Sequence, residues 1–155
     1  MIMFITHVRD SFADAFFPRL SEWFAACMLM ALGFMLSSNP DLMSTAKTSV
    51  YQLLLMIATQ ETWSTTMKLF ASGRLLILLI NGAWRRSPHL RSASAFVTCF
   101  FWTQIALSSM QTFGYVFTFS AGILLLDFVN SIRAARDARV VDLKYAEGRA
   151  AGGQN

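Results

Sequence analysis

Four long apolar runs constrain this chain more than any other feature of its sequence. They cover approximately Leu20–Ser38, Thr62–Trp84, Ser92–Met110 and Phe113–Ile132. Each run is close to the ~20 helical residues that cross a ~30 Å hydrocarbon layer at a rise of about 1.5 Å per residue. Only 14% of the 155 residues are charged, whereas about a quarter are charged in a typical soluble domain. The sequence therefore predicts an all-α fold, a four-transmembrane-helix bundle.

The distribution of basic residues predicts how this bundle is oriented. Ten of the thirteen Lys and Arg residues fall before the first run, between the second and third, and after the fourth: Arg9, Arg19, Arg85, Arg86, Arg91, Arg133, Arg136, Arg139, Lys144 and Arg149. The connection between the first two runs has Lys47 alone. Because Lys and Arg are retained on the cytoplasmic side of a membrane, both termini are predicted to be cytoplasmic. Membrane topology thus explains the net charge of +4. No nucleic-acid motif accompanies it, so no nucleic acid is expected as a partner.

The first 18 residues have the pattern of an amphipathic helix. In Met1–Phe17, apolar residues recur at three- and four-residue intervals while charged residues fall elsewhere on the helical wheel; the apolar ones are Ile5, Val8, Phe12 and Phe16. This predicts a helix in the cytoplasmic interface over residues 1–18, most simply a membrane-proximal anchor. A partner-binding or membrane-disrupting helix is the alternative. We expect a single membrane domain over residues 19–140, because its connections are too short to fold separately. Residues 141–155 are expected to form a basic, flexible cytoplasmic tail, with the helix fraying from Gly148.

A shorter apolar segment lies between the first and second runs. Val50–Ala58 is bounded by Ser and Thr residues before it and by Gln60 and Glu61 after it. Its length is too small for a span, which favours a short external interfacial helix lying over the bundle. Two alternatives remain open at this stage, a re-entrant helix and the beginning of a longer second span.

Polar residues inside the runs form the one candidate constellation. Arg74 and Asp127 are the only opposite charges well within the runs, since Lys68 is near enough to the external side to extend its ammonium there. Charges at such depth are costly and normally face protein or water. The predicted intramembrane polar cluster consists of Arg74, Asn81, Gln104 and Asp127. One interpretation is a buried Arg–Asp pair, with Asn81 or Gln104 filling the remaining hydrogen-bond positions. The other is a water-filled polar track or ion site.

The sequence offers little for catalysis. The two histidines, His7 and His89, are far apart and have no Glu or Cys at ligand spacing. There is no phosphate-binding loop and no nucleophile motif. We therefore expect no catalytic residues, no cofactor-binding residues and no metal site. The cysteines, Cys27 and Cys99, are expected to be packing residues. The stripe Ala95, Cys99 and Thr103 has the small-residue spacing that permits close approach of membrane helices.

Three segments of the second half resemble a known group of proteins. They are Ile80–Arg91, with the sequence INGAWRRSPHLR, Cys99–Gln104, and Leu124–Arg139. Over about Glu61–Arg139 the chain resembles a group of small, uncharacterised polytopic membrane proteins encoded by tailed bacteriophages and prophages. The resemblance implies a phage gene product in the bacterial inner membrane. It attaches to no established activity.

Two classes of function follow as hypotheses. The first is a non-enzymatic, phage-type inner-membrane protein that acts by self-association or by association with other membrane or virion components. A holin-like role is one concrete form, although four spans exceed the one to three usual in holins. The alternative is a small channel or transporter with a polar track around Arg74 and Asp127. In either case the lipid bilayer is a partner of the chain.

Overall fold

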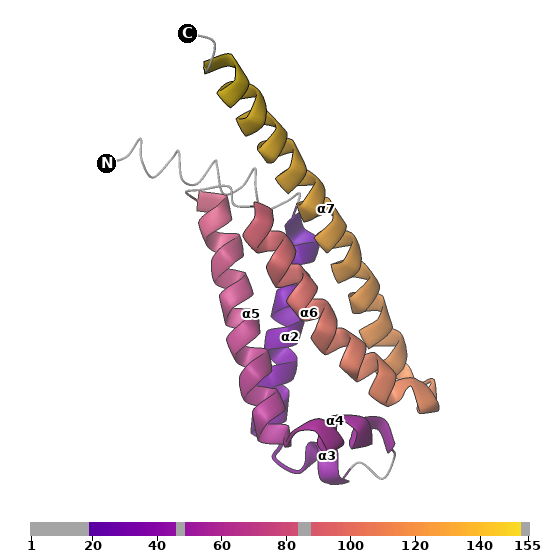
Figure 1. Ribbon diagram of the computed structural model, residues 1–155. Helices are drawn as coiled ribbons and strands as arrows, with labels where there is room; N and C mark the ends of the chain where they lie inside the picture. Colours follow the sequence, from indigo (N-terminus) through magenta and orange to yellow (C-terminus); the bar gives the residue numbers. More distant parts are fainter. Residues whose placement is uncertain (1–18, 46–48, 84–87, 153–155) are drawn as a thin grey trace, which may run out of the picture.

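A computed structural model describes residues 19–45, 49–83 and 88–152 (Figure 1). These residues are helical with short connections, and they contain no strand. The predicted amphipathic helix of residues 1–18 lies outside the described residues, as does Lys47.

Four long helices account for the four apolar runs. They are α2 (Leu20–Ser38), α5 (Gln60–Ala83), α6 (Pro88–Ser109) and α7 (Tyr115–Gly152). Each is long and apolar enough to cross a membrane. The predicted all-α class and the four helices of spanning length are therefore confirmed. Such a set of helices is typical of an integral membrane protein.

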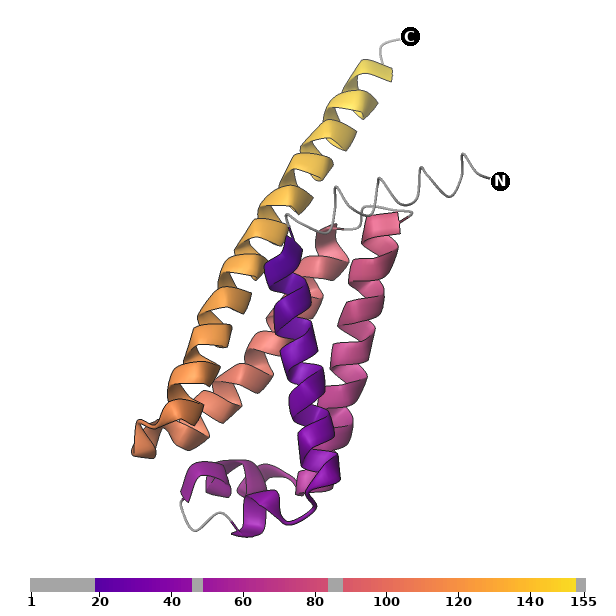
Figure 2. The same ribbon diagram turned by 180° about the vertical axis from the view of Figure 1, so that it is seen from behind.

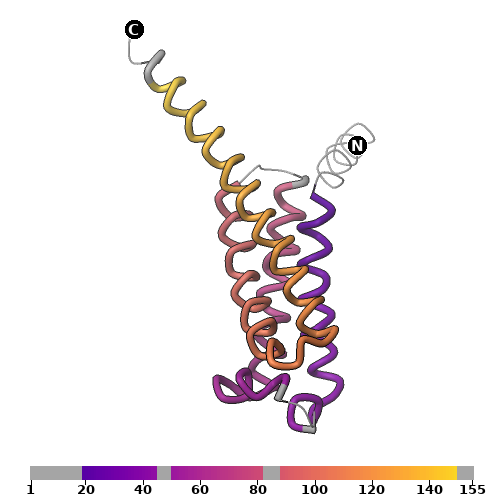
Figure 3. Tube along the Cα trace, turned by 90° about the vertical axis from the view of Figure 1, so that its right-hand side faces the viewer, coloured from indigo at the N-terminus to yellow at the C-terminus, as the bar shows by residue number. Residues whose placement is uncertain are grey.

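The two pairs of long helices separate toward one end of the bundle. Helices α6 and α7 lie side by side, as do α2 and α5, and α6 also packs against α5 (Figure 2). At the end where α2 begins, α7 continues past the other long helices (Figure 3). At the opposite end the pairs diverge. The space between them is covered by a cap made of α3 (Leu42–Thr45), η2 (Ser49–Tyr51) and α4 (Gln52–Ile57).

Side chains of the long helices hold this cap in place. Gln60 donates to the carbonyl oxygens of Leu36 and Asn39, and it accepts from the backbone N–H of Met43. The indole N–H of Trp63 donates to the Leu54 carbonyl at 2.8 Å. These bonds tie backbone groups at the ends of α2, α3 and α4 to the start of α5, which stabilises the connection.

The cap settles part of the question left open for Val50–Ala58. Helix α4 ends at Ile57, and Ala58 is extended, with φ −157° and ψ 163°. The chain therefore leaves the helix before α5 starts at Gln60. The alternative in which this segment begins a longer second span is wrong. The physical reason is that Trp63 of α5 and Ser108 of α6 donate to the carbonyl oxygens of Leu54 and Val50, which holds the segment over the bundle.

The C-terminal end of α7 also differs from the expectation. The helix is continuous past Gly148 to Gly152, so the predicted fraying does not begin at Gly148. Residues 153–155, which the same prediction covers, lie outside the described residues. Ala146, Glu147 and Arg149 beside that glycine are strong helix formers, which offset its weak helix propensity of about 1 kcal/mol relative to Ala. No break separates the predicted membrane domain from its tail at residue 141.

The distribution of exposed side chains fits an apolar surrounding. Large apolar side chains such as Leu69, Phe96 and Leu125 are exposed, whereas Arg74, Thr98, Asp127 and Asn130 are almost completely buried. Polar residues inside and apolar residues outside are what a helix bundle in lipid requires, because lipid cannot hydrogen-bond a polar group.

Candidate functional site

Three helices bring an arginine, a threonine and an aspartate together in the middle of the bundle. Arg74 of α5 donates two parallel hydrogen bonds to Asp127 of α7, from Nη1 to Oδ2 at 2.7 Å and from Nη2 to Oδ1 at 2.6 Å. Thr98 of α6 bonds to the same carboxylate at 2.6 Å and also contacts Arg74 Nη1. The side chains of Arg74 and Asp127 are 1% and 0% exposed. We call Arg74, Thr98 and Asp127 the central triad.

The geometry of the central triad is that of a structural ion pair. A bidentate contact between a guanidinium and a carboxylate is the strongest arrangement of these groups. Because the two charges neutralise each other, the free-energy cost of burying them is lower. Both charges are removed from solvent in this conformation. The triad can therefore hold α5, α6 and α7 in one register, but it is not a water-lined path.

The predicted polar cluster is only partly assembled. Arg74 and Asp127 meet, as one of the two interpretations expected. Asn81 lies two turns farther along α5, where its backbone oxygen accepts from Arg19 at 3.4 Å. Gln104 is half-buried, and its side chain makes no hydrogen bond with the part of the chain that the structure describes. Thr98 of α6, which the predicted cluster did not include, contacts both members of the pair.

Thr98 is not among the residues of the polar cluster predicted from the sequence. Its spacing of three residues from Ala95 places both residues on one face of α6, which is the signal that the sequence contains. In the structure the Thr98 hydroxyl also bonds to the Ala95 carbonyl at 2.9 Å. Ala95 is buried, while Cys99 and Thr103 are half-buried. The face of α6 that enters the bundle therefore runs through Ala95 and Thr98, rather than along the whole predicted stripe.

A second ion cluster lies at the end of the bundle where α2 and α6 begin. Arg91 Nη2 contacts Glu22 Oε1 at 2.5 Å, and Arg91 Nη1 contacts Asp137 Oδ2 at 3.1 Å. Arg91 and Glu22 are buried, whereas Asp137 is 59% exposed. The sequence predicts Arg91 only as one of the basic residues that set the topology. In the fold it also joins α2 to α6 and α7.

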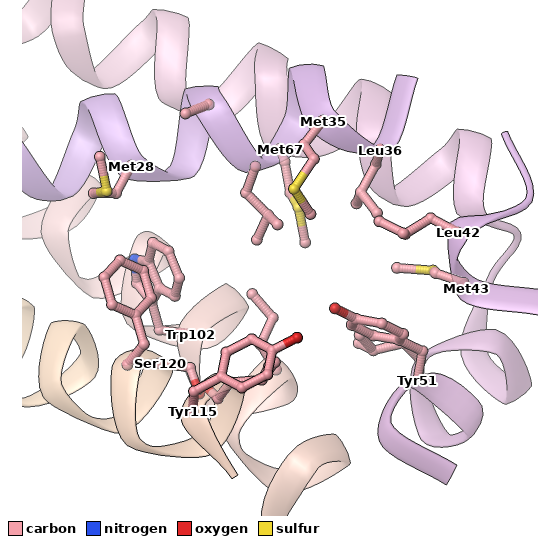
Figure 4. Close-up of a pocket in the computed structure, with 16 residues that line it drawn as sticks. Met28, Met35, Leu36, Leu42, Met43, Tyr51, Met67, Trp102, Tyr115 and Ser120 are labelled. Atoms are coloured by element: carbon pink, nitrogen blue, oxygen red, sulfur yellow. The ribbon is translucent and has the colours of Figure 1, made fainter. Parts of the chain in front are cut away.

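A large apolar cavity lies between the diverging helix pairs, next to the cap. Its volume is about 480 Å³ (Figure 4). Helices α5 and α6 form its floor through Met67, Trp102 and Ile105, which are all buried. Helices α2 and α7 form its two sides, and the cap closes its end through Leu42, Met43, Tyr51 and Leu54. Neither Arg74 nor Asp127 lines it.

The described residues offer no cluster for metal chemistry. They contain no group of three His, Cys, Asp or Glu side chains placed to hold a metal ion. His89 contacts Asp142 through Nε2 at 3.1 Å, but both side chains are largely exposed. Comparison of the chain with protein-family models, with curated proteins and with solved structures found no match.

Proposed function

We propose that this chain is a phage-type protein of the bacterial inner membrane, with both termini in the cytoplasm, that acts by assembly rather than by catalysis. Its partners are a second copy of itself or other membrane or virion proteins. The resemblance to phage-encoded membrane proteins supports the setting, and the asymmetry of basic residues supports the orientation.

The observation that supports assembly best is an apolar seam along the far part of α7. Ala134, Ala138, Val141 and Tyr145 recur at intervals of four, three and four residues, which is the spacing of a coiled-coil seam. Ala134 and Ala138 are 1% and 6% exposed. Farther along, Val141 is half-buried and Tyr145 is 68% exposed. The seam thus begins at residues that the other helices bury, and it continues to residues that they leave exposed.

The length of α7 makes this seam available on the cytoplasmic side. Its 38 residues extend about 57 Å at a rise of 1.5 Å per residue, and the hydrocarbon layer is about 30 Å thick. The projecting part is therefore several turns long. A parallel copy of the same helix fits this seam, because the seam of each copy would then cover the other's exposed tyrosine.

The arrangement of the central triad also supports assembly over a channel. Its charges bond to each other rather than lining a path. This disfavours the alternative of a channel or transporter with a track around Arg74 and Asp127, which in this conformation has no access to water.

Cysteine crosslinking in native membranes at low expression tests the proposal. In a background of Cys27→Ala and Cys99→Ala, we expect Tyr145→Cys to form a disulfide-linked dimer on mild oxidation of membrane vesicles. The matched control is Leu143→Cys, which lies about 200° away around the same helix and should crosslink far less.

The other outcomes separate the functional classes. A protein that crosslinks at neither position and yet conducts ions in reconstituted bilayers would overturn assembly in favour of the channel. Dimers accompanied by lysis of the host on induced expression would identify the holin-like form. Dimers without lysis would support anchoring or another non-lytic role.

A further inference from the structure

The apolar cavity beside the cap opens sideways, in the direction where a membrane-spanning bundle meets lipid. Its exposed lining residues all come from the two helices at its sides: Ala31 and Met35 on α2, and Tyr115 and Phe119 on α7. The floor residues from α5 and α6 are buried, and the cap closes the end. The mouth therefore lies between α2 and α7.

A hydrogen bond joins helices α2 and α7 away from this mouth. Near the start of α2, the Ser21 hydroxyl donates to Asn130 Oδ1 of α7 at 2.7 Å. Toward the cap the two helices diverge (Figure 2). Residues of both helices line the cavity there. An occupant can thus enter from the side without breaking the bond between Ser21 and Asn130.

The lining is suited to a flexible hydrocarbon chain. Four methionines border the cavity, namely Met28, Met35, Met43 and Met67. Methionine is flexible and adapts to an occupant of variable shape. The volume of about 480 Å³ falls within the ~300–1,000 Å³ typical of small-molecule sites. Ser120 adds little polarity, since its hydroxyl already donates to the Val116 carbonyl at 2.7 Å.

Two tyrosine hydroxyls are found at one end of the cavity. The hydroxyls of Tyr51 and Tyr115 point toward each other beside the cap (Figure 4). Burial, and secondarily the nearby Tyr115, raise the pKa of Tyr51 above its usual value, so its hydroxyl stays protonated and able to donate. Tyrosines are common at the level of the lipid headgroups, where such donors meet ester oxygens.

We propose that this cavity binds one acyl chain of a bilayer phospholipid from the leaflet on the cap side, with Tyr51 and Tyr115 near the ester groups. The chain enters between α2 and α7 and lies against Trp102 and Met67. The proposal requires that the bundle spans a membrane, but it does not depend on assembly through α7.

Native mass spectrometry of the full-length protein tests this proposal. The protein is released from membranes in mild detergent, stripped of lipid and then exposed to phosphatidylglycerol. We expect one phospholipid to bind. Ala31→Phe and Met35→Trp add bulk at the mouth and should lower the affinity about tenfold or more, since several methylene groups no longer fit. Gly73→Phe is the control, because a side chain there meets open space on α5.

Two results would overturn the proposal, one from the unmodified protein and one from the variants. If the unmodified protein takes up no phospholipid, or if it binds only free palmitate at the same concentration, the proposal is overturned whatever the variants do. Equal binding by Gly73→Phe and the two mouth variants would also overturn it, because the lipid would then be on the outer surface. Gel filtration establishes that each variant is folded before binding is compared.

Discussion

Arg74 and Asp127 form a bidentate ion pair between α5 and α7, with hydrogen bonds of 2.7 and 2.6 Å. The two residues are 53 positions apart in the chain. Among the three contacts of the central triad, this one joins the residues that are farthest apart in the sequence. Both charges are buried, and each lowers the desolvation cost of burying the other.

We predict strong coupling between these two residues. Arg74→Ala or Asp127→Ala alone leaves an uncompensated buried charge and should lower the free energy of unfolding by about 3–5 kcal/mol. The double variant should be more stable than the worse single variant. Unfolding in mixed detergent micelles, followed by circular dichroism, measures all three. Strictly additive losses would show that the ion pair is not formed.

Thr98 is predicted to matter more than a threonine five residues along the same helix. Thr98→Val removes a hydroxyl bonded to the Asp127 carboxylate, and it should cost about 1.5–3 kcal/mol, the usual value for a hydrogen bond to a charged group. Thr103→Val is the control, since that hydroxyl bonds only to the Cys99 carbonyl in its own helix. The same micelle unfolding assay compares them. Equal effects would remove Thr98 from the triad.

The two carboxylates around Arg91 are predicted to contribute unequally. Glu22→Gln leaves a buried guanidinium without its buried counter-charge and should destabilise by a few kcal/mol. The side chain of Asp137 is 59% exposed, so solvent screening should limit the effect of Asp137→Asn to about 0.2–1 kcal/mol. Unfolding at low and high salt distinguishes them, because only the exposed pair should weaken with salt. The reverse order of effects would contradict this assignment.

Gly33 is predicted to fix the close approach of α2 and α5. A Cβ atom there would lie 2.8 Å from Lys68 Cγ and 3.2 Å from the Ser64 carbonyl oxygen. The Lys68 side chain can move, but the Ser64 backbone cannot, so Gly33→Ala should separate the helices and cost about 1–3 kcal/mol.

Gly73→Ala is the matched control, because a Cβ atom at Gly73 meets nothing within 4 Å. It should be neutral or stabilising by up to about 1 kcal/mol, the difference in helix propensity. Thermal aggregation in detergent ranks the two variants. A destabilised Gly73→Ala together with a stable Gly33→Ala would refute the contact.

Reporter fusions test the orientation. Fusions after Arg91 and after Arg149 should report cytoplasm, and a fusion near Asp41 should report the exterior, because basic residues flank the cytoplasmic ends of the predicted spans. A C-terminal reporter on the external side would contradict this orientation and would place the α7 seam outside the cell.

The number and nature of the helices could be predicted from the sequence because they depend on local quantities. A run such as Leu20–Ser38 needs only its length and composition to be identified as a helix able to cross a membrane. Polar residues inside such runs must find partners, so a pair between Arg74 and Asp127 was one of two outcomes open from their sequence positions.

Only the tertiary structure decided which residues meet. Thr98 joins the pair while Gln104 does not, Glu22 binds Arg91 from 69 positions away, and the cavity exists because α2 and α7 diverge. These outcomes depend on the rotation and tilt of each helix about its axis. Apolar runs leave both undetermined, since lipid contacts every apolar face equally well, and the packing of whole helices against one another sets them.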